Sequence, residues 1–134
     1  MNQYQVSFGS AISRALSQYC CFTGRASRSE YWWWALFVFL IGMAFGVLQI
    51  IFLTAGGPGS TMGKLFDWLE WIWEIAVFLP SLGLTFRRLH DTGHSGWNIC
   101  WGLLPVIGWI ILLVYYCKPS EMQDNEYGQV PNVI

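Results

Sequence analysis

The sequence predicts an all-α integral membrane protein with three transmembrane helices and a short N-terminal interfacial helix. Three observations support this fold class: the scarcity of charge, three long apolar runs, and an amphipathic segment before the first run. The 134 residues are 54% hydrophobic and only 11% charged, whereas soluble domains carry about 25% charged residues. So few charges could not cover a water-facing surface. The length fits one domain, so we expect residues 1–134 to form a single membrane domain.

The first predicted span covers residues 32–53, which contain no charged side chain. As a helix these 22 residues would be about 33 Å long, enough to cross a hydrocarbon core of about 30 Å. Ser27 and Glu30 have capping-box spacing just before it, which predicts a helix start at that point. Glycine, proline and polar residues over 54–60 predict where the helix ends.

The second predicted span covers about residues 66–86. Its first half is amphipathic because Asp67, Glu70 and Glu74 recur at i, i+3 and i+7 and therefore share one stripe of a helix. Pro80 can kink this helix, as prolines do in membrane helices whose neighbours satisfy the freed carbonyl.

The third predicted span covers residues 97–117, an uncharged run of 21 residues. Pro105 again permits a kink, and Trp97, Tyr115 and Tyr116 stand at the two ends, where aromatic residues mark membrane interfaces. We expect residues 1–30 to form a cytoplasmic or interfacial N-terminal segment, with a surface helix within 6–22. Residues 118–134 are polar and should form an extended tail.

The lysines and arginines predict the orientation. With three spans, five arginines share one side with the N-terminus, and Lys64 and Lys118 lie on the other. Because positive residues accumulate on the cytoplasmic side, we expect a multi-pass protein of the bacterial inner membrane with a cytoplasmic N-terminus and an external tail. A re-entrant segment would bring the tail back to the cytoplasmic side.

Two segments carry a family resemblance. The first is Phe22-Thr-Gly-Arg-Ala-Ser-Arg-Ser-Glu-Tyr-Trp32, and the second is Phe86-Arg-Arg-Leu-His-Asp-Thr-Gly-His-Ser-Gly-Trp97. Two shorter stretches add to them, Pro105-Val-Ile-Gly-Trp109 and Asn125-Glu-Tyr-Gly-Gln-Val-Pro131. Together they resemble the DUF 805 family, small bacterial inner-membrane proteins whose domain has no established function. The resemblance implies an integral inner-membrane protein with about three helices and implies no activity.

The main candidate site is a cluster of arginines where the first two spans meet the cytoplasm. Its members are Arg25, Arg28, Arg87 and Arg88. Guanidinium groups bind oxyanions through two parallel hydrogen bonds, so the cluster could hold phosphates of anionic lipid headgroups. Alternatively, these arginines only fix the orientation and pair with Glu30 and Asp91. Asp91 is the expected partner of Arg25 or Arg28 across the loop.

The segment from His90 to His94 superficially resembles a His-Glu-x-x-His zinc motif, which needs a continuous helix. Gly93 and Gly96 favour a loop instead, and no third ligand is evident, so we expect no metal site. We expect His90 and Asp91 to join the hydrogen bonds of the arginines. The four cysteines lack metal-ligand spacing and should pack as apolar residues.

Glu70 and Glu74 are intramembrane acidic candidates. Glu74 lies seven residues beyond Asp67, or about 10 Å deeper along the helix. A carboxylate at that depth should face protein or water, so Glu74 is either a proton or cation site or part of an interfacial amphipathic turn. Three helices cannot enclose a wide pathway, and a transporter would therefore require a homo-oligomer.

These features favour a structural or regulatory membrane protein that contacts anionic lipid or another membrane protein through its arginine face. The alternative is an oligomeric transporter or channel subunit that uses Glu74. An enzyme acting on a phosphate-bearing lipid, with His90 or Asp91 as base, ranks last, so we expect no catalytic residues and no cofactor. A pI near 6.0 lacks the strongly basic balance of nucleic-acid binders, so we expect no nucleic-acid partner.

Overall fold

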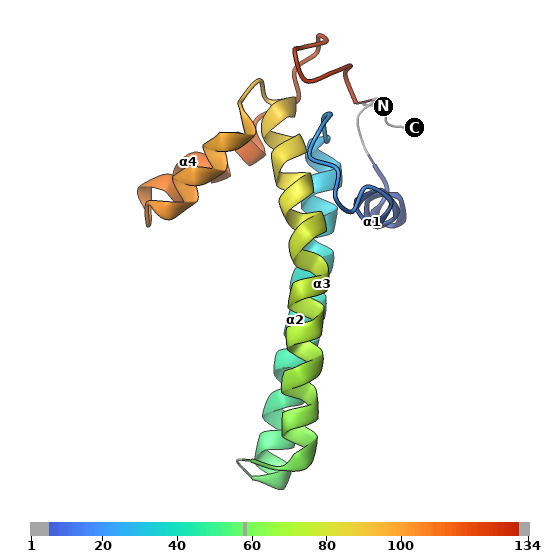
Figure 1. Cartoon of the computed structure of the whole chain (residues 1–134), viewed down its shortest axis with the longest axis vertical. Helices are drawn as coiled ribbons and strands as arrows, with labels where there is room; N and C mark the ends of the chain where they lie inside the picture. The colour runs from blue at the N-terminus through green and yellow to red at the C-terminus, as the bar shows by residue number, and fades with distance from the viewer. Residues whose placement is uncertain (1–5, 58, 132–134) are drawn as a thin grey trace.

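The computed structural model describes residues 6–57 and 59–131, and these residues form five helices. In chain order the helices are α1 (Phe8–Ser17), α2 (Arg28–Gly56), α3 (Thr61–Asp91), the 3₁₀-helix η1 (Gly96–Leu103) and α4 (Ile107–Cys117). Figure 1 shows α2 and α3 as a long antiparallel pair with the other elements gathered around one end. We call residues 35–79 the stalk and the remaining described residues the head.

The two long helices contain the first two predicted spans. Both α2 and α3 are long and apolar enough to cross a membrane. The Ser27 hydroxyl caps α2 by accepting a hydrogen bond from the Glu30 amide at 3.3 Å, as predicted. Pro80 lies inside α3 and is buried. Beside it, Trp34 Nε1 donates to the Ser81 hydroxyl at 3.0 Å and ties the two helices together where the stalk meets the head.

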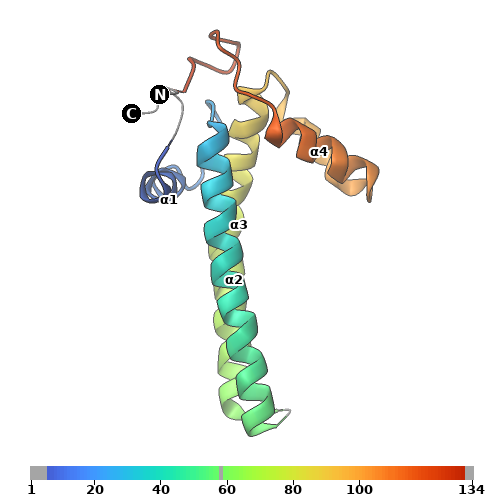
Figure 2. The same cartoon turned by 180° about the vertical axis from the view of Figure 1, so that it is seen from behind.

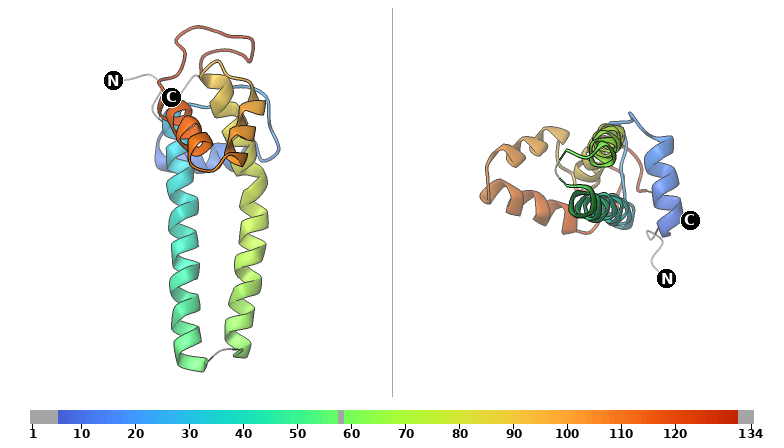
Figure 3. Two further views of the ribbon diagram at one scale, coloured as in Figure 1. Left: turned by 90° about the vertical axis from the view of Figure 1, so that its left-hand side faces the viewer. Right: turned by 90° about the horizontal axis from the view of Figure 1, so that it is seen from below.

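The predicted continuous helix over residues 97–117 is wrong, and a third membrane-spanning helix is not confirmed. The run is divided into η1 and α4, which pack side by side as a hairpin (Figure 3, left). Pro105 and Val106 form the turn, and Val106 has a left-handed φ of 65°. At Gly108 the arms approach so closely that a Cβ would lie 1.7 Å from the Trp101 carbonyl oxygen. The apolar run therefore reverses direction instead of kinking.

The remaining head elements flank the stalk. Helix α1 is shorter than the predicted segment and lies across the ends of α2 and α3 (Figure 3, right), with Ala11 and Ala15 buried beneath it. The tail from Lys118 runs back over the head (Figure 2), where the Glu121 amide donates to the Asp91 carbonyl at 3.1 Å. The tail therefore lies against the loop after Asp91, an arrangement that differs from the one expected for three spans with the tail on the opposite side of the membrane. Residues 1–5 and 132–134, which belong to the predicted N-terminal segment and tail, lie outside the described residues.

Candidate functional site

Asp91, at the C-terminal end of α3, is the centre of a buried polar network in the head. Its Oδ1 accepts from Arg25 Nε at 3.1 Å, and its Oδ2 lies 2.5 Å from Arg88 Nη1. The Ser120 hydroxyl also donates to Oδ2. The side chains of Arg25, Asp91 and Arg88 are 1%, 0% and 0% exposed. One carboxylate thus accepts from three donors on three segments of the chain.

Arg25 connects this carboxylate to the tail. Its Nη1 donates to the Gln123 carbonyl at 2.8 Å, and its Nη2 donates to the Glu121 carbonyl at 2.6 Å. Arg25 lies in the loop between α1 and α2, so a single guanidinium holds that loop, the end of α3 and the tail together.

Arg88 connects the same carboxylate to the end of α4. Its Nη2 donates to the Tyr116 carbonyl at 3.0 Å and also contacts the Lys118 carbonyl. The last carbonyls of a helix have no partner within the helix and carry partial negative charge. Arg88 therefore stabilises the C-terminal end of α4 and holds it beside α3.

A second ion pair joins α2 to α3. Glu30, in the first turn of α2, lies 3.3 Å from Arg87 Nη1 and 3.7 Å from Arg14 Nη1. The predicted capping box is therefore half formed: Ser27 caps the helix, while the Glu30 carboxylate binds guanidinium groups. Arg87 also contacts the Gln18 side chain, but its Nε and Nη2 are buried with no hydrogen-bond partner among the described residues.

Burial dominates the electrostatics of these groups, which lie beyond the apolar runs of the two spans. Burial raises the pKa of Glu30 and of Asp91, and the arginines beside each carboxylate oppose that shift. Burial lowers the pKa of His90. The His90 Nδ1 lies 3.2 Å from the Gly24 carbonyl, and its ring stacks on Tyr127 with centroids 4.1 Å apart. The head is therefore a desolvated site.

The structure brings most of the predicted head residues together and separates the others. Arg25, Arg87 and Arg88 are buried with Glu30 and Asp91, and the predicted contact between Asp91 and Arg25 is present. Arg28, by contrast, is exposed. An Arg28 side chain on the surface remains accessible to an external anion.

The acidic candidates lie in the stalk, away from the head network. Glu74 is exposed on α3, and Glu70 is half-buried. The stalk carboxylate with a hydrogen-bond partner is Asp67, which accepts from Gln49 Nε2 at 2.7 Å. The stripe predicted from the sequence is thus present on α3, with Asp67 bonded, Glu70 half-buried and Glu74 exposed.

The tail residues of the network were missed by sequence reasoning. Ser120 binds Asp91 through its side chain, Glu121 and Gln123 bind Arg25 through backbone carbonyls, and Asn125 Nδ2 donates to the His90 carbonyl at 3.0 Å. A backbone carbonyl has no residue-specific signature, so the two Arg25 contacts left no signal. The concentration of polar residues after Lys118 was the available hint.

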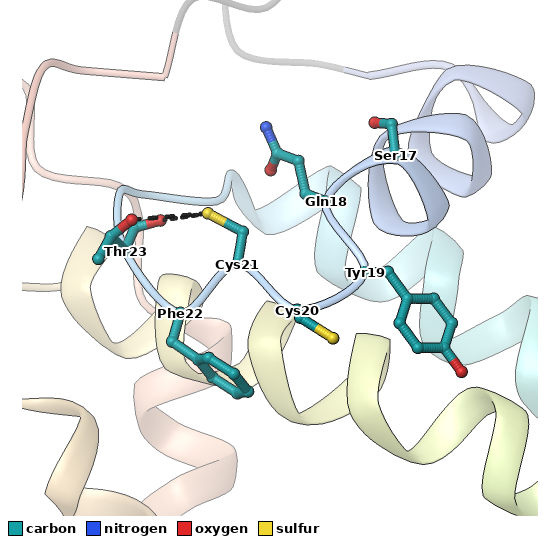
Figure 4. A pocket seen from close by; sticks show the side chains of 7 residues that line it. All are labelled: Ser17, Gln18, Tyr19, Cys20, Cys21, Phe22 and Thr23. Carbon is teal, nitrogen blue, oxygen red and sulfur yellow. Dashed lines mark hydrogen bonds between the residues drawn. The ribbon is translucent and has the colours of Figure 1, made fainter.

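The loop over residues 17–23 borders a shallow cavity of about 530 Å³. Figure 4 shows Gln18 and Cys21 on one side of this loop and Tyr19 and Phe22 on the other. The Cys21 thiol has a lowered pKa, caused first by the hydrogen bond from its neighbour Thr23. Among the described residues, no group of three or more histidine, cysteine or acidic side chains could hold a metal ion.

Two long apolar helices joined to a desolvated, ion-paired head define a small helical membrane protein. The chain belongs to the family described as "Protein of unknown function (DUF805)", whose model matches residues 19–129. This confirms the resemblance found in the sequence.

Two relatives agree on where such a protein resides. Inner membrane protein YhaI of Escherichia coli K12 is 39% identical over 119 residues, which cover 87% of this chain and 90% of the relative. Inner membrane protein YhaH of the same strain is 37% identical over 124 residues, covering 90% and 94%. No solved structure matches the chain. Both relatives are inner-membrane proteins, in agreement with the two helices that can cross a membrane.

Proposed function

We propose that this chain is a structural or regulatory protein of the bacterial inner membrane whose head lies at the cytoplasmic face and binds anionic lipid headgroups. One observation carries the proposal: six of the seven basic residues are at the head end, and only Lys64 is at the far end. The six are Arg14, Arg25, Arg28, Arg87, Arg88 and Lys118. Positive residues favour the cytoplasmic side, and anionic headgroups there attract them.

The burial of most of the arginines limits which of them can contact a lipid headgroup. A phosphate could reach Arg25 or Arg88 only by displacing Asp91, which already accepts from both. Removing one partner of a buried ion pair leaves an uncompensated charge and is strongly destabilising. Arg28 is exposed at the start of α2, and we therefore assign the headgroup contact to Arg28 in place of the four-arginine cluster.

The buried arginines have a different role in this proposal. They hold the loop before α2, the end of α3, the end of α4 and the tail in one arrangement, and this fixes Arg28 beside the bilayer surface. The proposal assigns no catalytic step and no cofactor to the chain.

The test is lipid retention by Arg28→Gln, with Lys64→Gln as the matched control at the opposite end. Both residues are exposed. Each protein is extracted into nanodiscs of phosphatidylglycerol and phosphatidylcholine, and bound lipid is measured by native mass spectrometry. We expect Arg28→Gln to lose phosphatidylglycerol selectively, with Lys64→Gln equal to the wild type. Equal retention by wild type and Arg28→Gln would reject the headgroup contact.

A second candidate function rests on Glu74. Its exposed carboxylate lies 12 residues before Phe86, or about 18 Å along the helix from the head-side end of the apolar run. A charge facing lipid at such depth costs a few kcal/mol, and a second copy of the chain could cover it. In such an oligomer, Glu74 would lie between the copies and could form part of a proton or cation pathway.

The discriminating experiment compares Glu74→Gln with Glu70→Gln in proteoliposomes. A pathway through Glu74 predicts that cation or proton flux is lost in Glu74→Gln and retained in Glu70→Gln. Absence of flux in the wild-type protein would reject this second candidate and leave the first unaffected.

A further inference from the structure

The hairpin formed by η1, the turn at 104–106 and α4 is an apolar element with little protein around it. Residues 97–117 contain no charged side chain. Trp97 is 79% exposed, Leu103 83% and Ile107 67%. Such a continuous apolar surface on a described part of the chain indicates contact with something other than water.

Both ends of the hairpin lie against the head: η1 packs on α3, where Gly96 is close to the Phe86 ring, and the end of α4 is bonded to Arg88. Arg88 binds the carbonyls of Tyr116 and Lys118 at the end of α4, and Asp91 accepts from Ser120 just beyond. The tip is free of such contacts: Figure 1 shows it pointing away from the stalk and inclined toward the far end of the long helices. The hairpin thus leaves the head and returns to it.

The arms are too short to cross a bilayer. Eight residues of 3₁₀-helix and eleven of α-helix each extend about 16 Å. A hydrocarbon core is about 30 Å thick, so each arm can reach only its middle. The length therefore fits insertion into one leaflet.

The turn pairs several of its backbone groups within the hairpin, which lowers the cost of placing it in hydrocarbon. The Leu104 amide donates to the Trp101 carbonyl at 3.0 Å, and the Gly108 amide donates to the Leu104 carbonyl at 3.1 Å. Pro105 has no amide hydrogen to satisfy. Across the hairpin, Trp109 Nε1 donates to the Gly102 carbonyl at 3.1 Å. Irregular backbone with unsatisfied groups is costly at lipid-exposed positions, and these bonds reduce that cost.

We propose that residues 97–117 form a re-entrant hairpin that inserts tip first into the acyl chains of the head-side leaflet and does not cross the membrane. The occupant of the apolar surface is lipid acyl chain, continuous with the lipid around α2 and α3. The tail after Lys118 then lies on the same side as the loop following Asp91. This inference does not depend on which side is cytoplasmic or on the lipid contact of Arg28.

The first test compares the sides on which the tail and the turn between α2 and α3 lie. Single cysteines are placed at the exposed residues Met122 and Thr61, with the native cysteines replaced by alanine, and intact spheroplasts are treated with a membrane-impermeant maleimide. We expect one position to react before the membrane is opened and the other only afterwards. Reaction of both positions under the same condition would mean that residues 97–117 cross the membrane, and would overturn the proposal.

Full-length fusions provide a check that needs no cysteine replacement. Green fluorescent protein or alkaline phosphatase is attached after the last residue, and the side it reports is compared with that of the native lysine at 64, labelled by an impermeant amine reagent. The proposal requires opposite sides. The same side would overturn it.

The second test measures depth and identifies the occupant. Nitroxide labels at Leu104→Cys, Ile75→Cys and Met122→Cys report the hairpin tip, the stalk and the tail, and all three parent residues are exposed. We expect the label at 104 to behave as the label at 75 does, with strong relaxation by oxygen and loss of relaxation by a nickel chelate. Strong nickel relaxation at 104 would place the tip in water. Weak relaxation by both reagents would mean that a second copy or another protein covers the tip, and either result would reject the acyl-chain assignment.

Discussion

The stalk and the head of this molecule are stabilised in opposite ways. No described residue between 35 and 79 is buried, and apolar side chains such as Phe39 and Ile50 are more than half exposed. The head contains the buried charges, with Asp91 and Arg88 inaccessible. The stalk thus depends on lipid around it and on its own helical hydrogen bonds, whereas the head depends on ion pairs inside it. A low-charge composition therefore does not mean that charge is unimportant to the fold.

The largest difference between the head and the stalk is expected when one aspartate is replaced in each region. Asp91→Asn removes the charge that Arg25 and Arg88 share, so we expect the free energy of unfolding to fall by about 3–5 kcal/mol, as for other broken buried pairs. Asp67→Asn is the matched control in the stalk, where the carboxylate accepts a hydrogen bond from Gln49, and about 1 kcal/mol is expected. Denaturant unfolding in detergent micelles measures both. Equal losses would show that the two regions do not differ as described.

The next comparison uses glycine. Gly108→Ala would place a Cβ against the Trp101 carbonyl, whereas a Cβ on Gly42 in the stalk meets nothing within 4 Å. Overpacking costs about 1–3 kcal/mol, so we expect Gly108→Ala to lower the thermal midpoint. Gly42→Ala should leave it unchanged or raise it, since glycine in a helix is less favourable than alanine by about 0.5–1 kcal/mol. A Gly108→Ala protein as stable as the wild type would contradict the close crossing of the hairpin.

A smaller effect is expected at the junction between the regions. Ser81→Ala leaves the Trp34 indole without its partner, and a hydrogen bond of this kind contributes about 1 kcal/mol. Thr54→Val is the control, because the Thr54 hydroxyl bonds only to carbonyls of its own helix. Tryptophan fluorescence during unfolding should show the difference, and its absence would mean that this bond does not couple α2 to α3.

The smallest expected effect is the pH dependence of the head. Burial lowers the pKa of His90 in the folded protein below its value of about 6.5 in the unfolded chain. The contribution of neutral His90 is therefore complete above pH 6.5 and is lost as the pH falls through the folded-state pKa. We expect the thermal midpoint of the wild type to drop more than that of His90→Gln between pH 7.5 and 5.5. Parallel pH profiles would exclude a contribution from His90.

The first two spans were predictable because an uncharged run of sufficient length determines a membrane helix, and Ser27 defines its start. Residues 97–117 met the same criterion and folded differently. An apolar sequence predicts that a segment prefers lipid to water. It does not predict whether the segment forms one straight helix or folds back as a hairpin. The reversal depends on the left-handed φ of Val106 and the close approach at Gly108, and neither has a hydropathy signal.

The candidate site was predictable in its pairing and unpredictable in its burial. The antiparallel arrangement of two spans brings Arg25 near Asp91, and this can be deduced from where the runs end. The tail that covers them lies up to 103 residues away from Arg25 and binds through backbone carbonyls. No local sequence pattern predicts such a contact. The sequence therefore suggested a lipid-facing arginine cluster, whereas three of these arginines are buried inside the head.

The bond from Arg25 to the Gln123 carbonyl also sets an order of events during biosynthesis. Gln123 is synthesised 98 residues after Arg25 and after both long helices. Until then the guanidinium lacks this tail partner and must keep water around it, which delays closure of the head until the segment around Gln123 has been made. A chain that stops before Gln123 would leave Arg25 without that partner.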